Sequence, residues 1–219
     1  MEFLNYLIDL FLNLDEHLHE LILQYGTFTY AILFVVIFAE TGFVFTPFLP
    51  GDSLLFAAGT FAAKGSFDVT LLFIILSLAA VIGDTINYWI GHFIGLKIFD
   101  KYPRLLKKEY LDRTHRFYEK HGGKTIILAR FFPIIRTFAP FVAGVGKMTY
   151  SKFISYNVIG GVLWCAIFIY VGYFFGNLDF VKNNFSVIVL AIVIIPGLPT
   201  AYEFARQLMR KRKQKKSVK

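Results

Sequence analysis

Five long apolar stretches constrain this chain more than any other feature of its sequence. They comprise residues 28–48, 69–99, 125–145, 153–175 and 185–204. Each is close to or above the roughly 20 residues that an α-helix needs to cross a bilayer. Only 17% of the 219 residues are charged, whereas soluble domains carry about 25%. The sequence therefore predicts an all-α polytopic membrane protein.

The net charge of +8 is concentrated in two basic clusters beside the apolar stretches. Nine Lys and Arg lie between Lys97 and Lys124, and eight lie between Arg206 and the end of the chain. Basic residues in the loops that flank membrane helices are typical of the cytoplasmic side. We therefore expect both clusters, including the basic tail 206–219, in the cytoplasm, and we expect no nucleic acid as a partner.

The N-terminal segment has the pattern of an amphipathic helix. No Lys or Arg precedes Lys64, whereas a cleavable signal peptide begins with a basic region. Large apolar side chains recur on one side of residues 3–24, and acidic residues lie between them. We expect residues 1–27 to form a helix at the membrane interface, ahead of a membrane domain at 28–205.

Two of the apolar stretches carry prolines, glycines and charges that do not suit a straight spanning helix. These residues are Glu40 and Pro47 in the stretch 28–48, with Pro50, Gly51 and Asp52 directly after it, and Arg130, Pro133, Arg136, Pro140 and Gly144 in the stretch 125–145. Proline removes a backbone donor, and a broken backbone inside hydrocarbon must be surrounded by protein or a wet cavity. We therefore predict two re-entrant hairpins, at about 28–64 and 124–150.

The two predicted hairpins share a spacing that suggests an internal repeat. Glu40 precedes Pro50 by ten residues, and Arg130 precedes Pro140 by ten. An Ala-Gly pair follows in each half, at residues 58–59 and 143–144. Each half then continues into a helix that ends in two glycines four residues apart, Gly91 and Gly95 in the first half, Gly172 and Gly176 in the second. The shared order of elements favours a duplicated unit.

The basic clusters predict how the two units are oriented. We expect spanning helices at about 69–95, 153–176 and 185–205. If residues 97–124 are cytoplasmic, the first hairpin opens outside, the second opens to the cytoplasm, and the C-terminus is cytoplasmic. Inverted units of this kind occur in many secondary transporters. Residues 104–121 look like an amphipathic helix on the headgroups, ended by Gly122 and Gly123.

Ionisable groups at membrane depth cost roughly 2.5–3.5 kcal/mol each on insertion scales, so they suggest function. Such residues here are Glu40, Asp52, Asp84, Arg130 and Arg136. Two guanidinium groups near a hairpin tip suit bidentate binding of phosphate, which lysine does less well. A carboxylate in an apolar setting can exchange a proton near neutral pH. We thus predict phosphate binding by Arg130 and Arg136, and proton coupling by Glu40, Asp52 and Asp84.

Structural roles are the alternative for these residues. Glu40 could pair with Arg130 and hold the hairpins together, and Asp52 or Ser53 could cap a helix. Gly160 and Gly161 fit close helix packing. The five histidines lack a cysteine cluster or metal-ligand spacing, so we expect no metal and no cofactor. No nucleophile–base grouping is present, so we do not expect an enzyme.

Five segments of the sequence resemble the DedA family of bacterial inner-membrane proteins, within the broader SNARE-associated or VTT-domain superfamily. These segments are residues 38–42, 47–55, 117–124, 129–140 and 143–146. With the hydropathy profile, the resemblance covers most of residues 25–205. The segments PFLPGDSLL and RTFAPFVAG are specific.

The resemblance implies two facing re-entrant hairpins and roles in envelope maintenance that depend on the proton motive force. It also implies lipid movement across the membrane, notably of undecaprenyl phosphate, with phosphatidylethanolamine in other members. The family's functional acids correspond to Glu40 and Asp52, and its functional arginines to Arg130 and Arg136. Lipids and protons are thus the expected partners. A proton/cation antiporter and a structural envelope-assembly factor are the alternatives, and a homo-oligomer stays open.

Overall fold

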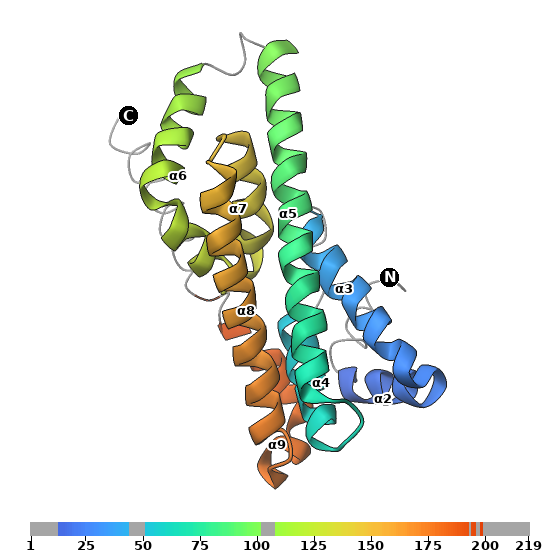
Figure 1. Ribbon diagram of the computed structural model, residues 1–219. Helices are drawn as coiled ribbons and strands as arrows, with labels where there is room; N and C mark the ends of the chain where they lie inside the picture. Colours follow the sequence, from blue (N-terminus) through green and yellow to red (C-terminus); the bar gives the residue numbers. More distant parts are fainter. Residues whose placement is uncertain (1–12, 44–50, 102–107, 193, 196–197, 199–219) are drawn as a thin grey trace, which may run out of the picture.

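The computed structural model of this chain describes residues 13–43, 51–101, 108–192, 194–195 and 198. Every regular element within these ranges is a helix (Figure 1). The helices are α2 (Leu14–Tyr25), η1 (Gly26–Phe28), α3 (Thr29–Gly42), α4 (Gly51–Ala63), α5 (Val69–Lys101), α6 (Lys108–Ala129), α7 (Pro133–Val145), α8 (Tyr150–Phe175) and α9 (Asp179–Asn183). Residues 185–192 are helical as well. The all-α prediction is confirmed.

Three helical stretches in the described part are long and apolar enough to cross a membrane: Leu14–Gly42, Val69–Ile94 and Tyr150–Phe175. The first is not straight, because Gly26 has a φ of 52° and the chain turns there. In Figure 1, α2 lies across the foot of α3 and α3 rises at a steep angle to it. By itself α3 has 14 residues, about 21 Å of helix at 1.5 Å per residue.

Besides α3, the two segments predicted as hairpins contain the short helices α4 and α7. The 13-residue α4 is buried along almost its whole length, from Gly51 to Ala62. Pro47 and Pro50 lie outside the described residues. In the second segment the chain turns at residues 130–132, Pro133 begins α7, and Pro140 lies inside this helix. Pro140 thus does not end the helix, since one lost backbone bond is tolerated where α7 packs along α5.

The predicted stop at Gly122 and Gly123 is wrong, because α6 continues through both residues to Ala129. The two glycines are packing positions. A methyl group at Gly122 would lie 2.8 Å from Cε of Met148, and one at Gly123 would overlap the ring of Tyr156. The amphipathic helix and the first arm of the second hairpin segment are therefore one continuous helix.

The longest helices, α5 and α8, each pack against a short helix from the other half of the chain. In the first half α4 lies along α8, and in the second half α7 lies along α5. Glycines permit close approach at both interfaces. A methyl group at Gly59 would overlap the carbonyl oxygen of Ile169, and one at Gly172 would overlap that of Phe56.

The α5–α7 interface repeats this arrangement. A methyl group at Gly144 would overlap the carbonyl oxygen of Tyr88, and one at Gly91 would overlap that of Phe141. In all four helices the glycine follows the residue with the facing carbonyl by three positions. Each interface therefore brings two helix backbones into contact through a reciprocal pair of glycines, as small residues do in membrane helix pairs.

We expect Gly172→Ala to weaken the α4–α8 interface strongly. The new methyl group must displace backbone rather than a side chain, and overpacking of this kind costs about 1–3 kcal/mol. The free energy of unfolding, measured by SDS titration of the purified protein in mixed micelles, should fall by this amount. Gly42→Ala is a matched control, because its methyl group would lie 3.5 Å from Gly83, an ordinary contact. Equal stability of the two variants would contradict the packing role.

The predicted helix 185–205 is described only in part. Phe185 and Val189 are buried on its first turns, and the Ser53 hydroxyl donates to the carbonyl oxygen of Val189 at 3.4 Å. This segment therefore packs near the start of α4. The rest of the predicted helix and the basic tail 206–219 lie largely or wholly outside the described residues, as do residues 1–12 of the N-terminal segment.

Candidate functional site

All five charged residues predicted at membrane depth are buried in the structure. Glu40 is fully buried, and Asp52, Asp84, Arg130 and Arg136 are each at most 6% exposed. They come from different elements: α3, α4, α5, the turn after α6, and α7. The structure brings them together as two ion-pair clusters, which we name after their arginines.

The Arg136 cluster joins the two segments predicted as hairpins. Nη1 of Arg136 lies 2.6 Å from Oδ1 of Asp52, and its Nη2 pairs with Oε1 of Glu40. Glu40 stands near the end of α3 and Asp52 in the first turn of α4, so one guanidinium group binds both arms of the first segment. Asp52 lies within α4 and is not its cap, which removes that alternative role.

The start of α4 is shaped around the Glu40 carboxylate. The backbone N–H of Gly51 donates to Oε1 of Glu40 at 3.1 Å. A side chain at Gly51 would overlap this carboxylate, so a larger residue here would displace the Glu40 side chain from its present position. A helix N-terminus carries partial positive charge and free N–H groups, and it stabilises a carboxylate placed there. Glu40 therefore occupies an anion site made by Arg136 and the first turn of α4.

Trp164 completes the Arg136 cluster, and the sequence analysis did not identify it. Its indole N–H donates to Oδ1 of Asp52 at 2.8 Å. The Arg136 guanidinium lies 5.3 Å from the centre of the Trp164 ring, within cation–π range. A tryptophan inside an apolar stretch needs an acceptor for its N–H when buried. This need for an acceptor was the signal in the sequence from which Trp164 could have been predicted as a site residue.

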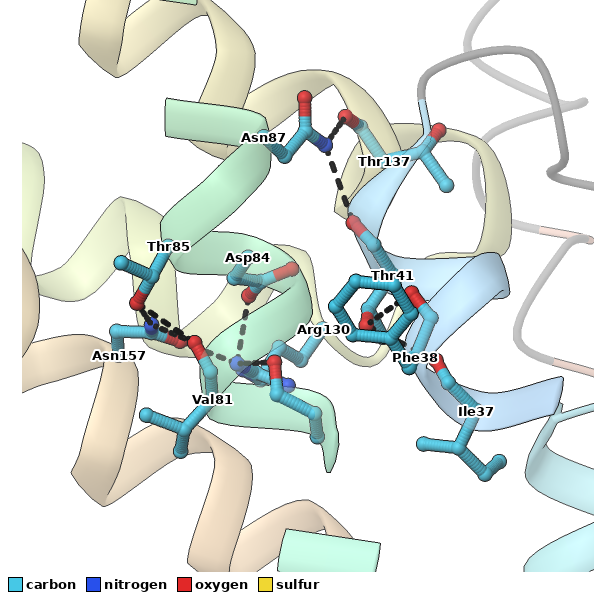
Figure 2. A network of polar contacts seen from close by, with 11 residues as sticks. Ile37, Phe38, Thr41, Val81, Asp84, Thr85, Asn87, Arg130, Thr137 and Asn157 are labelled. Atoms are coloured by element: carbon cyan, nitrogen blue, oxygen red, sulfur yellow. Dashed lines mark hydrogen bonds and ion pairs between the residues drawn. The ribbon is translucent and has the colours of Figure 1, made fainter. Parts of the chain in front are cut away.

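The Arg130 cluster lies between α5, α8 and the turn after α6 (Figure 2). Nη2 of Arg130 is 2.5 Å from Oδ2 of Asp84, and it also donates to Oδ1 of Asn157. The Asn157 amide N–H₂ donates in turn to the carbonyl oxygen of Val81 at 3.0 Å and to the hydroxyl of Thr85 at 3.3 Å. Asn157 thus holds α8 against α5 while it orients Arg130.

Gly160 and Gly161 of α8 make room for the Arg130 side chain. A methyl group at Gly160 would lie 3.2 Å from Cδ of Arg130, and one at Gly161 would lie 3.3 Å from its Nη2. Their role is therefore wider than helix packing alone. The suggested pair between Glu40 and Arg130 is wrong, because Glu40 pairs with Arg136 and Arg130 pairs with Asp84.

Asn87 connects the backbones beside the Arg136 cluster. Its amide N–H₂ donates to the carbonyl oxygen of Thr41 at 3.2 Å and to that of Thr137 at 2.8 Å (Figure 2). Thr41 follows Glu40 directly, and Thr137 follows Arg136. Asn87 on α5 therefore fixes the separation of α3 and α7 at the residues next to the ion pair. Like Trp164 and Asn157, it is a site residue that was not predicted from the sequence.

The charges of the two clusters do not balance when all are ionised. Among the described residues the buried charged groups are three carboxylates and two guanidinium groups, so their sum is 2 − 3 = −1. Within the described part of the chain, Oε2 of Glu40, Nε of Arg130 and Nε of Arg136 find no hydrogen-bond partner. The arrangement can therefore take up one proton, and each arginine keeps one unused donor.

Comparison with known proteins places most of these residues in a recognised domain. Residues 49–174 match the VTT domain. The chain is 50% identical over 209 residues to Protein DedA of Escherichia coli strain K12. The aligned residues are 94% of this chain and 95% of that protein. It is 45% identical over 187 residues to an uncharacterized membrane protein of Mycobacterium tuberculosis strain H37Rv, with 83% and 82% covered.

A more distant relative is the inner membrane protein YqjA of Escherichia coli strain K12. It is 29% identical over 181 residues, which are 82% of each chain. No solved structure matches this chain significantly. The matched domain contains Asp52, Asp84, Arg130 and Arg136, and Glu40 lies ahead of it.

Proposed function

Because this chain belongs to the VTT-domain family of membrane proteins, the DedA family, we propose that it is a lipid transporter of the bacterial inner membrane, driven by the proton motive force. The proposed cargo is an anionic lipid phosphate, with undecaprenyl phosphate as the expected lipid. The buried pairing of Arg136 with Glu40 and Asp52 is the observation that carries the proposal. It brings one guanidinium group and two carboxyl groups together, and groups of these kinds can bind phosphate and protons.

Phosphate binding is supported by the donors around Glu40. The carboxylate is held by the Arg136 guanidinium and by the Gly51 N–H, which are the donors that oxyanions of phosphate prefer. A lipid phosphate that reached this site would compete with Glu40 for the same donors. Protonation of Glu40 would release the donors, so proton uptake would favour phosphate binding.

The surplus negative charge supports proton coupling. Three carboxylates share two guanidinium groups, and a buried unpaired charge is costly. One proton bound by Glu40, Asp52 or Asp84 would neutralise the two clusters. The exchange of this proton between the two sides of the membrane would supply the driving force.

An alternating mechanism is supported by the crossed packing of the two halves. We infer that the segments 28–64 and 124–150 are re-entrant hairpins of an inverted repeat, with the site between them. The reciprocal glycine pairs of the α4–α8 and α5–α7 interfaces have the same spacing, as expected for two copies of one unit. Inverted units that rock about a central site are a common architecture of transporters.

The surplus negative charge also favours the alternative of proton/cation antiport. The variant Arg136→Lys separates this alternative from lipid transport. Lysine keeps the charge but loses bidentate binding of phosphate and of the two carboxylates. We expect the movement of labelled undecaprenyl phosphate in proteoliposomes to fall at least 10-fold. Under the antiport alternative, proton flux driven by a K⁺ or Na⁺ gradient should be much less affected, because lysine keeps the positive charge. Retained lipid movement in this variant would contradict the phosphate-binding role of Arg136.

A further inference from the structure

The outer face of α6 carries a basic ridge that the proposed transport site does not use. Arg116, Lys120 and Lys124 are exposed and follow one another at four-residue intervals. Exposed apolar side chains lie beside them, Phe117 at 49% and Leu128 at 58% exposure. Four-residue spacing places side chains along one line of a helix. We call Arg116, Lys120 and Lys124 the α6 ridge.

The opposite face of α6 is already occupied by the protein. Tyr118 and Ile126 are buried in a cluster with Met148 and Phe153, and the Tyr118 hydroxyl donates to the carbonyl oxygen of Ala139 at 3.2 Å. The α6 ridge is therefore the side of the helix that is left for an outside partner.

Contacts between α6 and the start of α8 show the depth of the α6 ridge relative to the membrane. Oε1 of Glu119 accepts hydrogen bonds from the Thr149 N–H at 2.9 Å and from its hydroxyl at 2.8 Å, and Oε2 pairs with Lys152. These bonds lower the pKa of Glu119 to about 2, the Lys152 bond most of all. The carboxylate is thus charged at any physiological pH. It fixes the middle of α6 at the start of α8.

Aromatic residues with polar groups mark the same level. Tyr156 lies against Gly123 of α6, and Tyr150 packs on Trp89 with ring centres 5.3 Å apart. All three aromatic side chains are partly exposed, at 37–38%. Tyrosine and tryptophan collect where the hydrocarbon core meets the headgroups. The α6 ridge therefore stands at headgroup level, between this aromatic belt and water.

We propose that the α6 ridge binds the headgroups of anionic phospholipids at this membrane surface. Three cations at headgroup level are complementary to lipid phosphate groups, and Phe117 and Leu128 fit the adjoining acyl chains. In the described part of the chain, no acidic side chain forms an ion pair with the α6 ridge. The nearby Glu119 is paired with Lys152 instead. The ridge is separate from Arg130 and Arg136, so this binding does not depend on lipid transport.

The test is retention of spin-labelled phosphatidylglycerol, relative to spin-labelled phosphatidylcholine, by the full chain in neutral vesicles. Lys120→Gln with Lys124→Gln should weaken the selectivity for phosphatidylglycerol about 30-fold at low salt, since each basic residue near an anionic surface contributes about a factor of five. Salt at 1 M should weaken the selectivity of the unchanged protein similarly. Lys120→Arg with Lys124→Arg should preserve it.

Lys64→Gln with Lys182→Gln is the matched control. It removes two exposed lysines, one directly after α4 and one in α9, away from α6 (Figure 1), and it changes the net charge equally. These two lysines form no line of basic residues, so selectivity should fall far less than in the ridge variant. Unaltered selectivity in the Lys120/Lys124 variant would overturn the proposal. An equal loss of selectivity in the ridge variant and in the control would also overturn the proposal. So would an equal loss of retention for phosphatidylglycerol and phosphatidylcholine. Loss of an acidic protein partner with unaltered lipid selectivity would overturn it in favour of a protein-binding surface.

Discussion

Arg136→Gln should be among the most destabilising single substitutions in this protein, with a loss of about 3–5 kcal/mol in the free energy of unfolding. Arg136 is the common partner of Glu40 and Asp52, so its loss leaves two carboxylates unpaired in a buried site. Water cannot replace the guanidinium group there, because both acids are at most 5% exposed. The measurement is SDS-induced unfolding of the purified protein in mixed micelles.

Two further variants make this result specific. Arg116→Gln removes an exposed arginine from α6 and should stay within about 0.5 kcal/mol of the unchanged protein. Glu40→Gln combined with Arg136→Gln should recover part of the lost stability, because one unpaired charge has been removed. If Arg136→Gln unfolds at the same SDS concentration as the unchanged protein, the ion pairs do not hold α3, α4 and α7 together.

Arg130→Gln should lower the free energy of unfolding by a comparable amount, again about 3–5 kcal/mol. It leaves Asp84 without its cation and Asn157 without its donor, on helices α5 and α8 that pack against each other. Asp84→Asn in the same chain should restore most of the loss, since replacement of a whole buried pair by neutral groups is often nearly neutral.

A double-mutant cycle measures this coupling. The loss in the double variant should be smaller than the sum of the two single losses by at least about 3 kcal/mol, the upper end of the range found for residues in direct contact. Lipid movement should stay low in the double variant, because Arg130 is then absent as a phosphate ligand. Additive losses in stability would show that Asp84 and Arg130 do not depend on each other.

The sequence predicted the helical class and the buried charges because both follow from the energetic cost of the bilayer. Glu40, Asp84, Arg130 and Arg136 interrupt apolar stretches and Asp52 closely follows one, and such residues must find partners inside the protein. The glycines at 59, 91, 144 and 172 were visible in the sequence as part of the predicted repeat. Their reciprocal contacts required the three-dimensional arrangement, since each glycine meets a carbonyl oxygen from the other half of the chain.

The pairing of the charges was not predictable from one sequence. Glu40 and Arg130 occupy matching places in the two halves, which favoured a pair between them. The structure instead pairs Glu40 with Arg136 six residues further along. Trp164, Asn157 and Asn87 were missed because neutral polar side chains leave no charge signal in a hydropathy pattern. The continuous α6 was missed because a Gly-Gly pair is more often a helix end than a packing site.

The central claim is that a lipid phosphate and a proton share the Arg136 cluster. The most direct measurement is the movement of labelled undecaprenyl phosphate across proteoliposomes of the purified protein, with and without a pH gradient. The account predicts movement faster than in empty liposomes, acceleration by the gradient in the unchanged protein, and loss of this acceleration in Glu40→Gln. Movement no faster than in empty liposomes, with or without the gradient, would contradict it.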